Sequence, residues 1–418
     1  MFHINTVRLR FAKNTENRVS KDREMKKLNR TVLVSDNKEK RVLIVAGEAS
    51  ADLHGSNLVR SIKKIDPGIS IWGVGGEKMK AAGVKILIPS SAMAVVGLTE
   101  VFSKLRTISK AYFQLKSILK RNDPDLLILL DYPDFNIHLA RSAKRFGIPV
   151  LYYISPQVWA WRKGRVKKIA DRVDRMAVIL PFEKPFYKKQ GLSVEYVGHP
   201  LLDAAPVRSD RNDAIRELGL EKADPVLGLL PGSRTDEVRN LLPVMIKASS
   251  LLSSRYPALK CVLPLASTIS PELVRSIIGK SPLDIKISRQ GIYQSLAACD
   301  MAVVASGTAT LEAAIMGIPM VIAYRVSPIS YWVGKIVVRV PHIGLVNLVA
   351  GEEIVPELIQ GEVTPERIVE EALIILKAGQ RRENMIKKLK EVKEKLGEGG
   401  ASERTARMAI EMINPNVA

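Results

Sequence analysis

Cysteine is nearly absent from this sequence: only Cys261 and Cys299 occur among its 418 residues. Each lies among apolar neighbours, and their spacing matches no metal-binding or redox motif. We therefore expect both to be small side chains of a hydrophobic core. A disulfide framework is excluded, and so few cysteines favour a reducing compartment.

Long apolar runs are also missing. No segment reaches the roughly 18 apolar residues that a membrane-spanning helix needs, and the longest runs are only as long as a strand. Residues 1–20 alternate apolar and basic side chains but lack the apolar centre of a secretory signal. Because residues 1–40 carry many charges and little to bury, we expect a basic, poorly ordered extension there. A transit peptide, a surface-binding arm and a translated leader before Met25 are the alternatives.

Signatures of several catalytic classes are absent as well. The five histidines show no metal-ligand spacing, and the chain contains no nucleophile elbow, Walker loop or HExxH motif. We therefore expect no metal site, and any chemistry must rest on other residues.

Positive charge, in contrast, is abundant. The formal net charge is +21 at pH 7, while the hydrophobic content of 46% and the charged content of 26% are those of a globular protein. Such a charge predicts a polyanionic partner, which can be nucleic acid, an anionic membrane surface or a phosphorylated substrate. Charge alone does not choose among these three.

The apolar runs that are present have the length and composition of buried parallel strands. Each is followed by a turn and then by a segment with helical periodicity. This alternation predicts parallel sheets with helices on both faces. The predicted strands cover residues 41–47, 69–76, 126–131, 150–155 and 176–182 in the first half, and 225–234, 259–266, 301–308 and 320–325 in the second.

A break rich in proline and aspartate, residues 197–219, separates the two halves of the chain. The chain is also too long for one ordinary domain. We predict an α/β fold of two Rossmann-like domains, residues 41–200 and 201–365, that face each other across a cleft. Residues 366–418 become helical and charged, and we expect them to pack back on the first domain or on a partner subunit.

Two carboxylates, Asp131 and Asp134, stand where the most apolar run of the chain ends. In open parallel sheets ligands bind outside the carboxyl ends of the strands, so residues at these ends are candidates. Asp134 follows Pro133 and precedes an amphipathic segment, so we expect it to cap a helix. Asp131 comes too early to cap, and a carboxylate there can act as a general base or brace the loop.

Other predicted strand ends carry residues suited to a substrate or its phosphates. Glu48 and Ser50 follow the first strand and can contact substrate, although Ser50 or Asp52 can instead cap the next helix. In the second half, a predicted helix start carries Gly232, which lets a phosphate approach the backbone, and Arg234, which can bind that phosphate. Ser233 and Asp236 at the same helix start resemble a capping box. Another helix start carries a glutamate that can bind ribose hydroxyls or simply face solvent. The second-half candidates are Gly232, Ser233, Arg234, Ser306, Gly307, Thr308 and Glu312.

Three segments are suited to a lipid surface or a phosphorylated acceptor. Residues 91–122 form an apolar loop and a basic amphipathic segment, and residues 331–345 mix aromatic, aliphatic and basic side chains. Residues 159–172 pair two tryptophans with five cations between Arg162 and Lys168, a composition that can bind a sugar phosphate, a lipid headgroup or RNA. An ordinary core-facing helix and strand are the alternatives for the first two. The candidate contact residues are Met93, Val95, Val96, Trp159, Trp161 and Arg162.

Taken in order along the chain, these motifs resemble those of the lipid-A-disaccharide synthase family, glycosyltransferases with two Rossmann-like domains in the GT-B arrangement. The resemblance extends from about Arg41 to the C-terminal region, and "SPQVWAWR" and "VNLVAGEE" are specific to the family rather than to the fold. The motifs are "VAGEASADLHG", "GVGGEKM", "LLDYPDFN", "YYISPQVWAWRKGR", "LPFEKPFY", "VGHPLLD", "LLPGSR", "ASGTATLEAAIMGIPMVIAYR" and "GLVNLVAGEEIVPELIQ".

The resemblance implies a reaction and a division of roles. UDP-2,3-diacylglucosamine is joined, with inversion, to 2,3-diacylglucosamine 1-phosphate (lipid X), which gives a β-1,6 disaccharide and UDP in lipid A biosynthesis. Asp131 is the implied catalytic base. Glu48, Ser50, Arg234 and Asn347 are implied in binding substrate or nucleotide, and no cofactor is implied.

The resemblance also implies where the substrates bind and what the chain contacts. Residues 41–200 are the acceptor domain, and residues 201–365 bind the UDP-sugar. The expected location is the cytoplasmic face of the inner membrane of a Gram-negative cell, to which the chain attaches peripherally. A homodimer is expected, and a nucleic-acid partner is not.

Two rival hypotheses use the same residues. A different UDP-N-acetylglucosamine-dependent transferase or epimerase keeps the fold but has no use for the apolar loop at residues 92–98. A basic RNA-binding protein predicts a steep salt dependence of binding and no release of UDP.

Overall fold

The structure is a computed structural model. It describes residues 39–93, 98–161, 164–206, 210–279, 281–327, 331–332 and 340–414. Side chains are described throughout these ranges except at residues 49, 98–105, 160 and 161. The predicted extension up to residue 38, together with Val95, Val96 and Arg162, lies outside the described residues.

The first half of the chain folds into a seven-stranded parallel sheet with the strand order β3-β2-β1-β4-β5-β6-β7. Its central strands are entirely buried because both faces are covered, which is why they appear in the sequence as unbroken apolar runs. The strands are β1 (Arg41–Ala46), β2 (Ser70–Gly75), β3 (Lys85–Pro89), β4 (Leu126–Leu130), β5 (Val150–Tyr153), β6 (Arg175–Val178) and β7 (Ser193–Tyr196).

Helices cover both faces of this sheet, and each face has its own hydrophobic core. On one face α5, α6 and α8 contribute Leu115, Leu139 and Ile169. On the other face α2 and α3 contribute Leu58 and Met79, and the last helix of the chain joins them. The helices of this half are α2 (Ala49–Ile65), α3 (Glu77–Ala81), α4 (Ser90–Met93), α5 (Leu98–Lys120), α6 (Pro133–Arg145), α7 (Val158–Trp161), α8 (Arg165–Ala170) and α9 (Glu183–Lys188).

The second half repeats the scheme with a six-stranded parallel sheet of order β10-β9-β8-β11-β12-β13. Cys261 on β9 and Cys299 before β11 are buried and unpaired, which confirms the prediction that both are core side chains. The strands are β8 (Val226–Leu230), β9 (Lys260–Pro264), β10 (Ile285–Ser288), β11 (Met301–Ala305), β12 (Met320–Tyr324) and β13 (Glu357–Ile359). The helices are α11 (Arg211–Leu218), α12 (Thr235–Ser253), α13 (Pro271–Ile278), α14 (Ile292–Ala297), α15 (Ala309–Ile315), α17 (Leu345–Ala350), α18 (Pro365–Leu376) and α19 (Gln380–Lys395), with the short 3-10 helix η1 (Gln360–Glu362).

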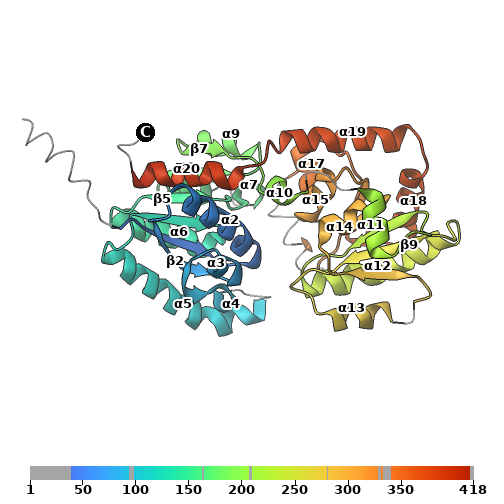
Figure 1. Ribbon diagram of the computed structural model, residues 1–418, viewed down its shortest axis with the longest axis horizontal. Helices are drawn as coiled ribbons and strands as arrows, with labels where there is room; N and C mark the ends of the chain where they lie inside the picture. Colours follow the sequence, from blue (N-terminus) through green and yellow to red (C-terminus); the bar gives the residue numbers. More distant parts are fainter. Residues whose placement is uncertain are drawn as a thin grey trace, which may run out of the picture.

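The two bodies lie side by side, and the chain crosses between them twice (Figure 1). The first crossing leads through α10 (Leu201–Ala204), and the second leads from α19 into α20 (Ala401–Ile413). The crossings are joined to each other: the His199 N–H donates to Leu396 O at 3.0 Å, and Arg404 donates to Val197 O through Nε at 2.9 Å and Nη2 at 2.7 Å.

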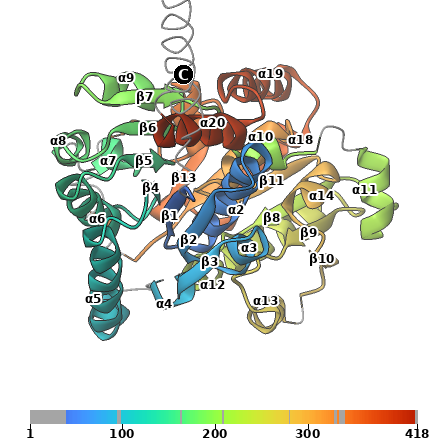
Figure 2. The ribbon, with the colours of Figure 1, turned by 60° about the vertical axis from the view of Figure 1, so that its left-hand side comes forward.

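The C-terminal helices do not behave as one unit. Helices α18 and α19 pack on the second body, against α12, α15 and α17, whereas α20 packs against α2 of the first. Figures 1 and 2 both show α20 lying along α2. Small residues on α20, including Ala401, Ala406 and Ala409, are buried in this contact and allow the two helices to approach closely. No helix within the described part of the chain has the length and apolar character needed to cross a membrane.

Candidate active site

Asp131 stands directly after β4, at the carboxyl edge of the first sheet, where the backbone is unusual. Asp131 and Tyr132 have φ values of 44° and 46°, and Ile154, just after the neighbouring strand β5, has a φ of 63°. These are left-handed conformations that cost free energy in residues other than glycine, most of all in a β-branched one. Such strain persists only where the surroundings enforce it, and it concentrates at functional sites.

Hydrogen bonds enforce this conformation. The buried amide of Asn136 donates through Nδ2 to Leu130 O at 3.1 Å and to Asp131 O at 2.7 Å. The hydroxyl of Tyr152 also donates to Asp131 O, at 2.5 Å, and the Asp131 N–H donates to Ile154 O at 3.4 Å. These bonds use backbone atoms of Leu130 and Asp131, and none of them uses the Asp131 carboxylate.

The loop after β1 lies against the Asp131 loop. The ring of Tyr132 packs on Gly47 so closely that a Cβ at Gly47 would lie 2.7 Å from the Tyr132 Cγ. Glycine is therefore required at this position, and the next residue, Glu48, is brought near Asp131. Burial, followed by the negative charge of Glu48, raises the pKa of Asp131 from 3.8 to about 6, against a hydrogen bond from the Tyr132 backbone. A carboxylate with that pKa is ionised at neutral pH yet basic enough to accept a proton.

The prediction that Asp134 caps a helix is wrong. Helix α6 begins at Pro133 and its N-cap position is Tyr132, so Asp134 lies inside the first turn. The two left-handed residues before Pro133 end the strand early and place Asp134 beyond the capping position. Its side chain is 70% exposed and forms an ion pair with Arg165 Nη1 at 2.5 Å.

The capping roles expected after β1 are also different from those in the structure. Glu48 occupies the N-cap position of α2 without making a side-chain capping bond, and both Glu48 and Ser50 are exposed. Asp52 serves α3 instead, because its carboxylate accepts from the N–H groups of Gly76 at 2.7 Å, Lys78 at 3.1 Å and Met79 at 3.1 Å. Glu48 and Ser50 thus remain available for a ligand beside Asp131.

Of the expected surface contacts, Met93 and Trp159 are buried, at 0% and 7% exposure. Met93 lies in the core beneath α5, and its carbonyl accepts from the hydroxyl of Tyr132 at 3.0 Å. Trp159 donates from Nε1 to the buried carboxylate of Glu183 at 3.0 Å. Neither placement matches a contact at an exposed surface. The side chain of Trp161 is outside the described ones, as are Val95, Val96 and Arg162.

In the second body, Gly232, Ser233 and Arg234 lead from β8 into α12, as predicted from the sequence. The expected capping partner, Asp236, is replaced by Glu237, whose Oε2 accepts from the N–H groups of Ser233 at 3.0 Å and Arg234 at 3.2 Å. Gly232, with a φ of 112°, has no room for a side chain, because a Cβ would lie 2.2 Å from Glu237 Oε2. The Arg234 side chain is 76% exposed and bonds Glu237 Oε1 at 3.1 Å.

A second loop leads from β11 into α15. The hydroxyl of Ser306 donates to Ile343 O at 2.9 Å, Gly307 has a φ of 154°, and Thr308 is the N-cap residue of α15 without a side-chain capping bond. Burial raises the pKa of Glu312, one turn into α15, from 4.5 to about 7. Among the described residues no donor bonds the Glu312 carboxylate, so it is free to accept hydrogen bonds from a ligand's hydroxyl groups.

Asn347 is fully buried, and both ends of its amide are used within the protein. Nδ2 donates to Val355 O and to Glu357 Oε1, both at 2.8 Å, and Oδ1 accepts from Ile354 N at 2.9 Å and Val355 N at 3.1 Å. Glu357 in turn accepts from the N–H groups of Ile343 and Gly344, next to the carbonyl that holds Ser306. The structure therefore connects Asn347 to Ser306 through the protein rather than exposing it to a ligand.

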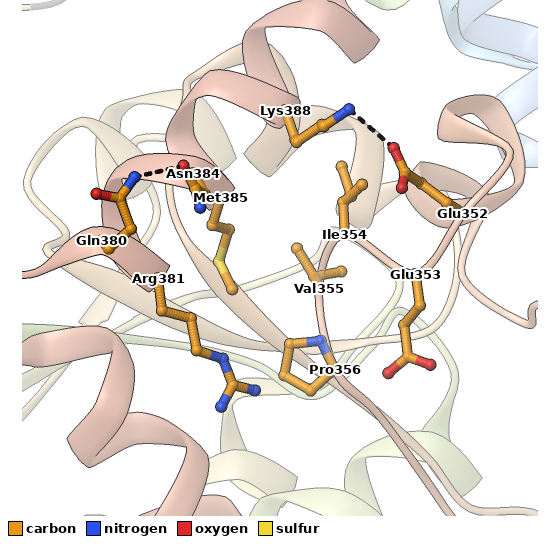
Figure 3. Close-up of a pocket in the computed structure, with 10 residues that line it drawn as sticks. All are labelled: Glu352, Glu353, Ile354, Val355, Pro356, Gln380, Arg381, Asn384, Met385 and Lys388. Carbon is orange, nitrogen blue, oxygen red and sulfur yellow. Dashed lines mark hydrogen bonds and ion pairs between the residues drawn. The ribbon is translucent and has the colours of Figure 1, made fainter.

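A cavity of about 490 Å³ is lined in part by Ile354 and Val355, whose N–H groups bond Asn347 (Figure 3). One wall is α19, and the other is the loop before β13, with Lys388 paired to Glu352 at 2.9 Å. None of the predicted site residues lines it. The lining residues are Glu352, Glu353, Ile354, Val355, Pro356, Gln380, Arg381, Asn384, Met385 and Lys388.

Comparison with known proteins identifies the family. The family model described as lipid-A-disaccharide synthetase matches residues 42–411. The chain belongs to the lipid-A-disaccharide synthase family. The lipid-A-disaccharide synthase of Geobacter metallireducens is 52% identical over 374 residues, covering 90% of this chain and 97% of that protein. The enzyme of Nitrosococcus oceani is 47% identical over 372 residues, covering 89% of this chain and 96% of that protein.

Solved structures support the fold independently of sequence. The UDP-N-acetylglucosamine 2-epimerase of Neisseria meningitidis aligns with a TM-score of 0.60 at 12% identity, covering 89% of this chain and 100% of that one. MurG from Acinetobacter baumannii aligns with a TM-score of 0.56 at 13% identity, covering 89% of this chain and 99% of that one. Together with the two parallel-sheet bodies, these confirm the predicted GT-B fold. Family membership makes the chain a glycosyltransferase of lipid A biosynthesis that uses a UDP-sugar and a lipid substrate.

Two residues that hold the site were missed by sequence reasoning. Asn136 and Glu183 were quoted within motifs but given no role, since nothing in the local sequence shows that their side chains are buried. Both lie in short segments that follow a strand and open a helix, which is the only sequence signal that could have found them.

Proposed function

We propose that the chain transfers the diacylglucosaminyl group of UDP-2,3-diacylglucosamine to the 6-hydroxyl of 2,3-diacylglucosamine 1-phosphate, with Asp131 as the general base. The observation that carries the assignment is the Asp131 loop itself. Its strained backbone is fixed by Asn136 and Tyr152, its carboxylate is not used by those bonds, and its pKa is raised to about 6.

The proposed step balances as a single displacement. Asp131 takes the proton of the acceptor's 6-hydroxyl while that oxygen attacks the anomeric carbon of the donor. The bond from this carbon to the UDP oxygen breaks, and UDP departs with the electron pair. Attack from the face opposite UDP inverts the anomeric centre and gives the β-linkage. General-base assistance of this kind contributes about 10²- to 10⁴-fold to a rate.

We assign the UDP moiety to the carboxyl edge of the second sheet. Arg234 projects into solvent at the start of the 19-residue helix α12, where backbone N–H groups and the helix dipole favour an anion. Glu237 presently accepts from two of those N–H groups, so an arriving diphosphate exchanges with its carboxylate. The unbonded Glu312 carboxylate suits the ribose hydroxyls, and Asn347 supports the Ser306 loop from behind.

We further propose that the chain attaches peripherally to the cytoplasmic face of the inner membrane, where both acylated substrates reside. Phe113 on α5 is 64% exposed, and Lys110, Lys116 and Lys120 lie on the same basic helix. An exposed aromatic ring among cations is typical of a helix that lies at a membrane surface. A homodimer remains a prediction from the family resemblance.

A matched pair of substitutions tests the base assignment. Asp131→Asn and Asp134→Asn make the same chemical change at two carboxylates three positions apart. We expect Asp131→Asn to lower the turnover of disaccharide formation by about 10²- to 10⁴-fold with unchanged UDP affinity. Asp134→Asn, which alters an exposed side chain in an ion pair, is expected to stay within a few-fold of the unsubstituted protein. Equal activity of the two variants would remove Asp131 from the mechanism.

A further inference from the structure

Glu183, at the start of α9, is a carboxylate buried to 1% exposure. Among the described residues no lysine or arginine forms an ion pair with it. Taking a charge out of water without a countercharge is costly, so such a group is retained only where hydrogen bonds replace the lost water. Burial raises the pKa of Glu183 from 4.5 to about 7, and its hydrogen bonds oppose that rise.

The groups that surround Glu183 are hydrogen-bond donors. Oε1 accepts from the Ser155 hydroxyl at 2.5 Å and from Trp159 Nε1 at 3.0 Å. Oε2 accepts from the N–H groups of Leu180 at 3.0 Å and Ile179 at 3.3 Å. A carboxylate satisfies donors on both oxygens, whereas an amide turns its own N–H groups toward one pair of them. The arrangement therefore suits a carboxyl group and not an amide.

The segment that Glu183 holds leads directly to the site. Ser155 follows Ile154, the residue with a φ of 63° whose carbonyl accepts from the Asp131 N–H. One turn later on α9, the Tyr187 hydroxyl donates to Pro156 O at 2.9 Å. The same short helix therefore bonds residues 155–159 through both Glu183 and Tyr187. The strained Ile154 backbone is thus enforced from outside its own strand.

The other end of the segment reaches the second body. The Trp159 ring packs edge-on against Phe182, with ring centroids 4.8 Å apart and planes at 82°. Trp159 belongs to the hydrophobic cluster that includes Leu201 of the first crossing and Leu311 of α15. By bonding Nε1 of Trp159, the carboxylate of Glu183 also holds a member of the hydrophobic cluster that the two bodies share.

We propose that Glu183 is a positioning residue for the transfer reaction. Its carboxylate fixes residues 154–159 after β5, and through the Ile154 carbonyl it fixes the backbone that holds Asp131. This inference rests on the proposed role of Asp131. It goes further because it assigns a role to Glu183 on α9, a residue that does not contact the substrates: Glu183 keeps the acceptor side of the site rigid.

The variant Glu183→Gln tests this, with Glu371→Gln as its control. Glu371 is also a buried carboxylate, at 9% exposure, but it lies on α18 and pairs with Arg381 at 2.8 Å, remote from the Asp131 loop. Turnover is expressed per UDP-binding site, counted by calorimetric titration with UDP, and the thermal unfolding midpoint is measured for each variant. Loss of folded protein lowers the number of UDP sites, whereas mispositioning lowers the turnover of each site.

We expect Glu183→Gln to lower turnover per UDP site by about 10- to 100-fold, the loss typical of a small displacement in a site, with UDP affinity within twofold. Glu371→Gln is expected to keep its turnover within twofold. Turnover per site within twofold for Glu183→Gln, or an equal loss in Glu371→Gln, would overturn the inference.

Milder variants apply if Glu183→Gln does not fold. Ser155→Ala and Trp159→Phe each remove one donor from Glu183, and each is expected to lower turnover per UDP site by several-fold. Unchanged turnover in both would overturn the inference. If the unsubstituted protein forms no disaccharide, the proposed function fails instead, so the two failures are distinguishable.

Discussion

Replacing Asp131 with asparagine should stabilise the protein while removing its activity. Burial and Glu48 raise the folded-state pKa of Asp131 from 3.8 to about 6. A carboxyl group whose pKa rises on folding is disfavoured in its ionised form by the fold. Asp131 therefore does not lower the free energy of unfolding below about pH 3.8, and it lowers that free energy by its full amount above about pH 6.

The size of the effect follows from the shift. A difference of roughly two pKa units corresponds to up to about 3 kcal/mol of destabilisation at pH 8, and about half of that at pH 5. Asparagine removes the charge and tolerates a left-handed backbone, here with a φ of 44°. The bonds from Asn136 and Tyr152 go to the backbone carbonyl and are unaffected.

Urea unfolding of Asp131→Asn and the unsubstituted protein at pH 5 and pH 8 measures this difference. We expect the variant to be more stable at both pH values, with the larger gain at pH 8. Asp134→Asn serves as the control, because its exposed ion pair contributes little. A variant that is less stable at pH 8, or whose gain does not grow with pH, would refute the burial argument for Asp131.

Three other perturbations have definite expected outcomes. The rate of disaccharide formation should rise with pH through a midpoint at about pH 6, as Asp131 ionises. Glu48→Gln should move that midpoint to lower pH because it removes a negative charge near Asp131. An unmoved midpoint in a pH–rate profile would contradict the influence of Glu48 on the Asp131 pKa. Arg234→Ala should weaken UDP binding roughly 10- to 100-fold, which corresponds to the loss of one charge-assisted hydrogen bond. Calorimetric titration measures this, and an unchanged affinity would mean that the diphosphate binds elsewhere. Asn347→Ala should lower the unfolding free energy by roughly 1–3 kcal/mol for each buried group left unpaired. If thermal unfolding shows no loss of stability while UDP affinity falls, Asn347 would instead contact UDP directly.

The fold could be predicted from the sequence where strands are buried on both faces. The central strands β1, β4, β5, β8, β11 and β12 are unbroken apolar runs, and all were predicted. The edge strands β3, β7, β10 and β13 were not. They are short and half-exposed, such as Ser193–Tyr196, and such edges carry no clear apolar pattern.

The position of Asp131 at a strand end could also be read from the sequence, but its surroundings could not. The left-handed backbone at Asp131 and Tyr132 is imposed by Asn136, Tyr152 and Ile154, which lie up to 23 positions away, and it displaced Asp134 from the expected cap. Local capping rules fail where long-range hydrogen bonds determine where a helix begins. Glu183 escaped notice for the same reason, since its partners Ser155 and Trp159 lie 28 and 24 positions away.

The measurement that tests the central claim most directly is the release of UDP from UDP-2,3-diacylglucosamine by the purified protein, with and without 2,3-diacylglucosamine 1-phosphate. The proposed mechanism predicts that UDP appears only with the acceptor, in equal amount to a β-linked disaccharide, and that Asp131→Asn lowers the rate of both by about 10²- to 10⁴-fold. UDP release at the same rate without the acceptor would contradict it.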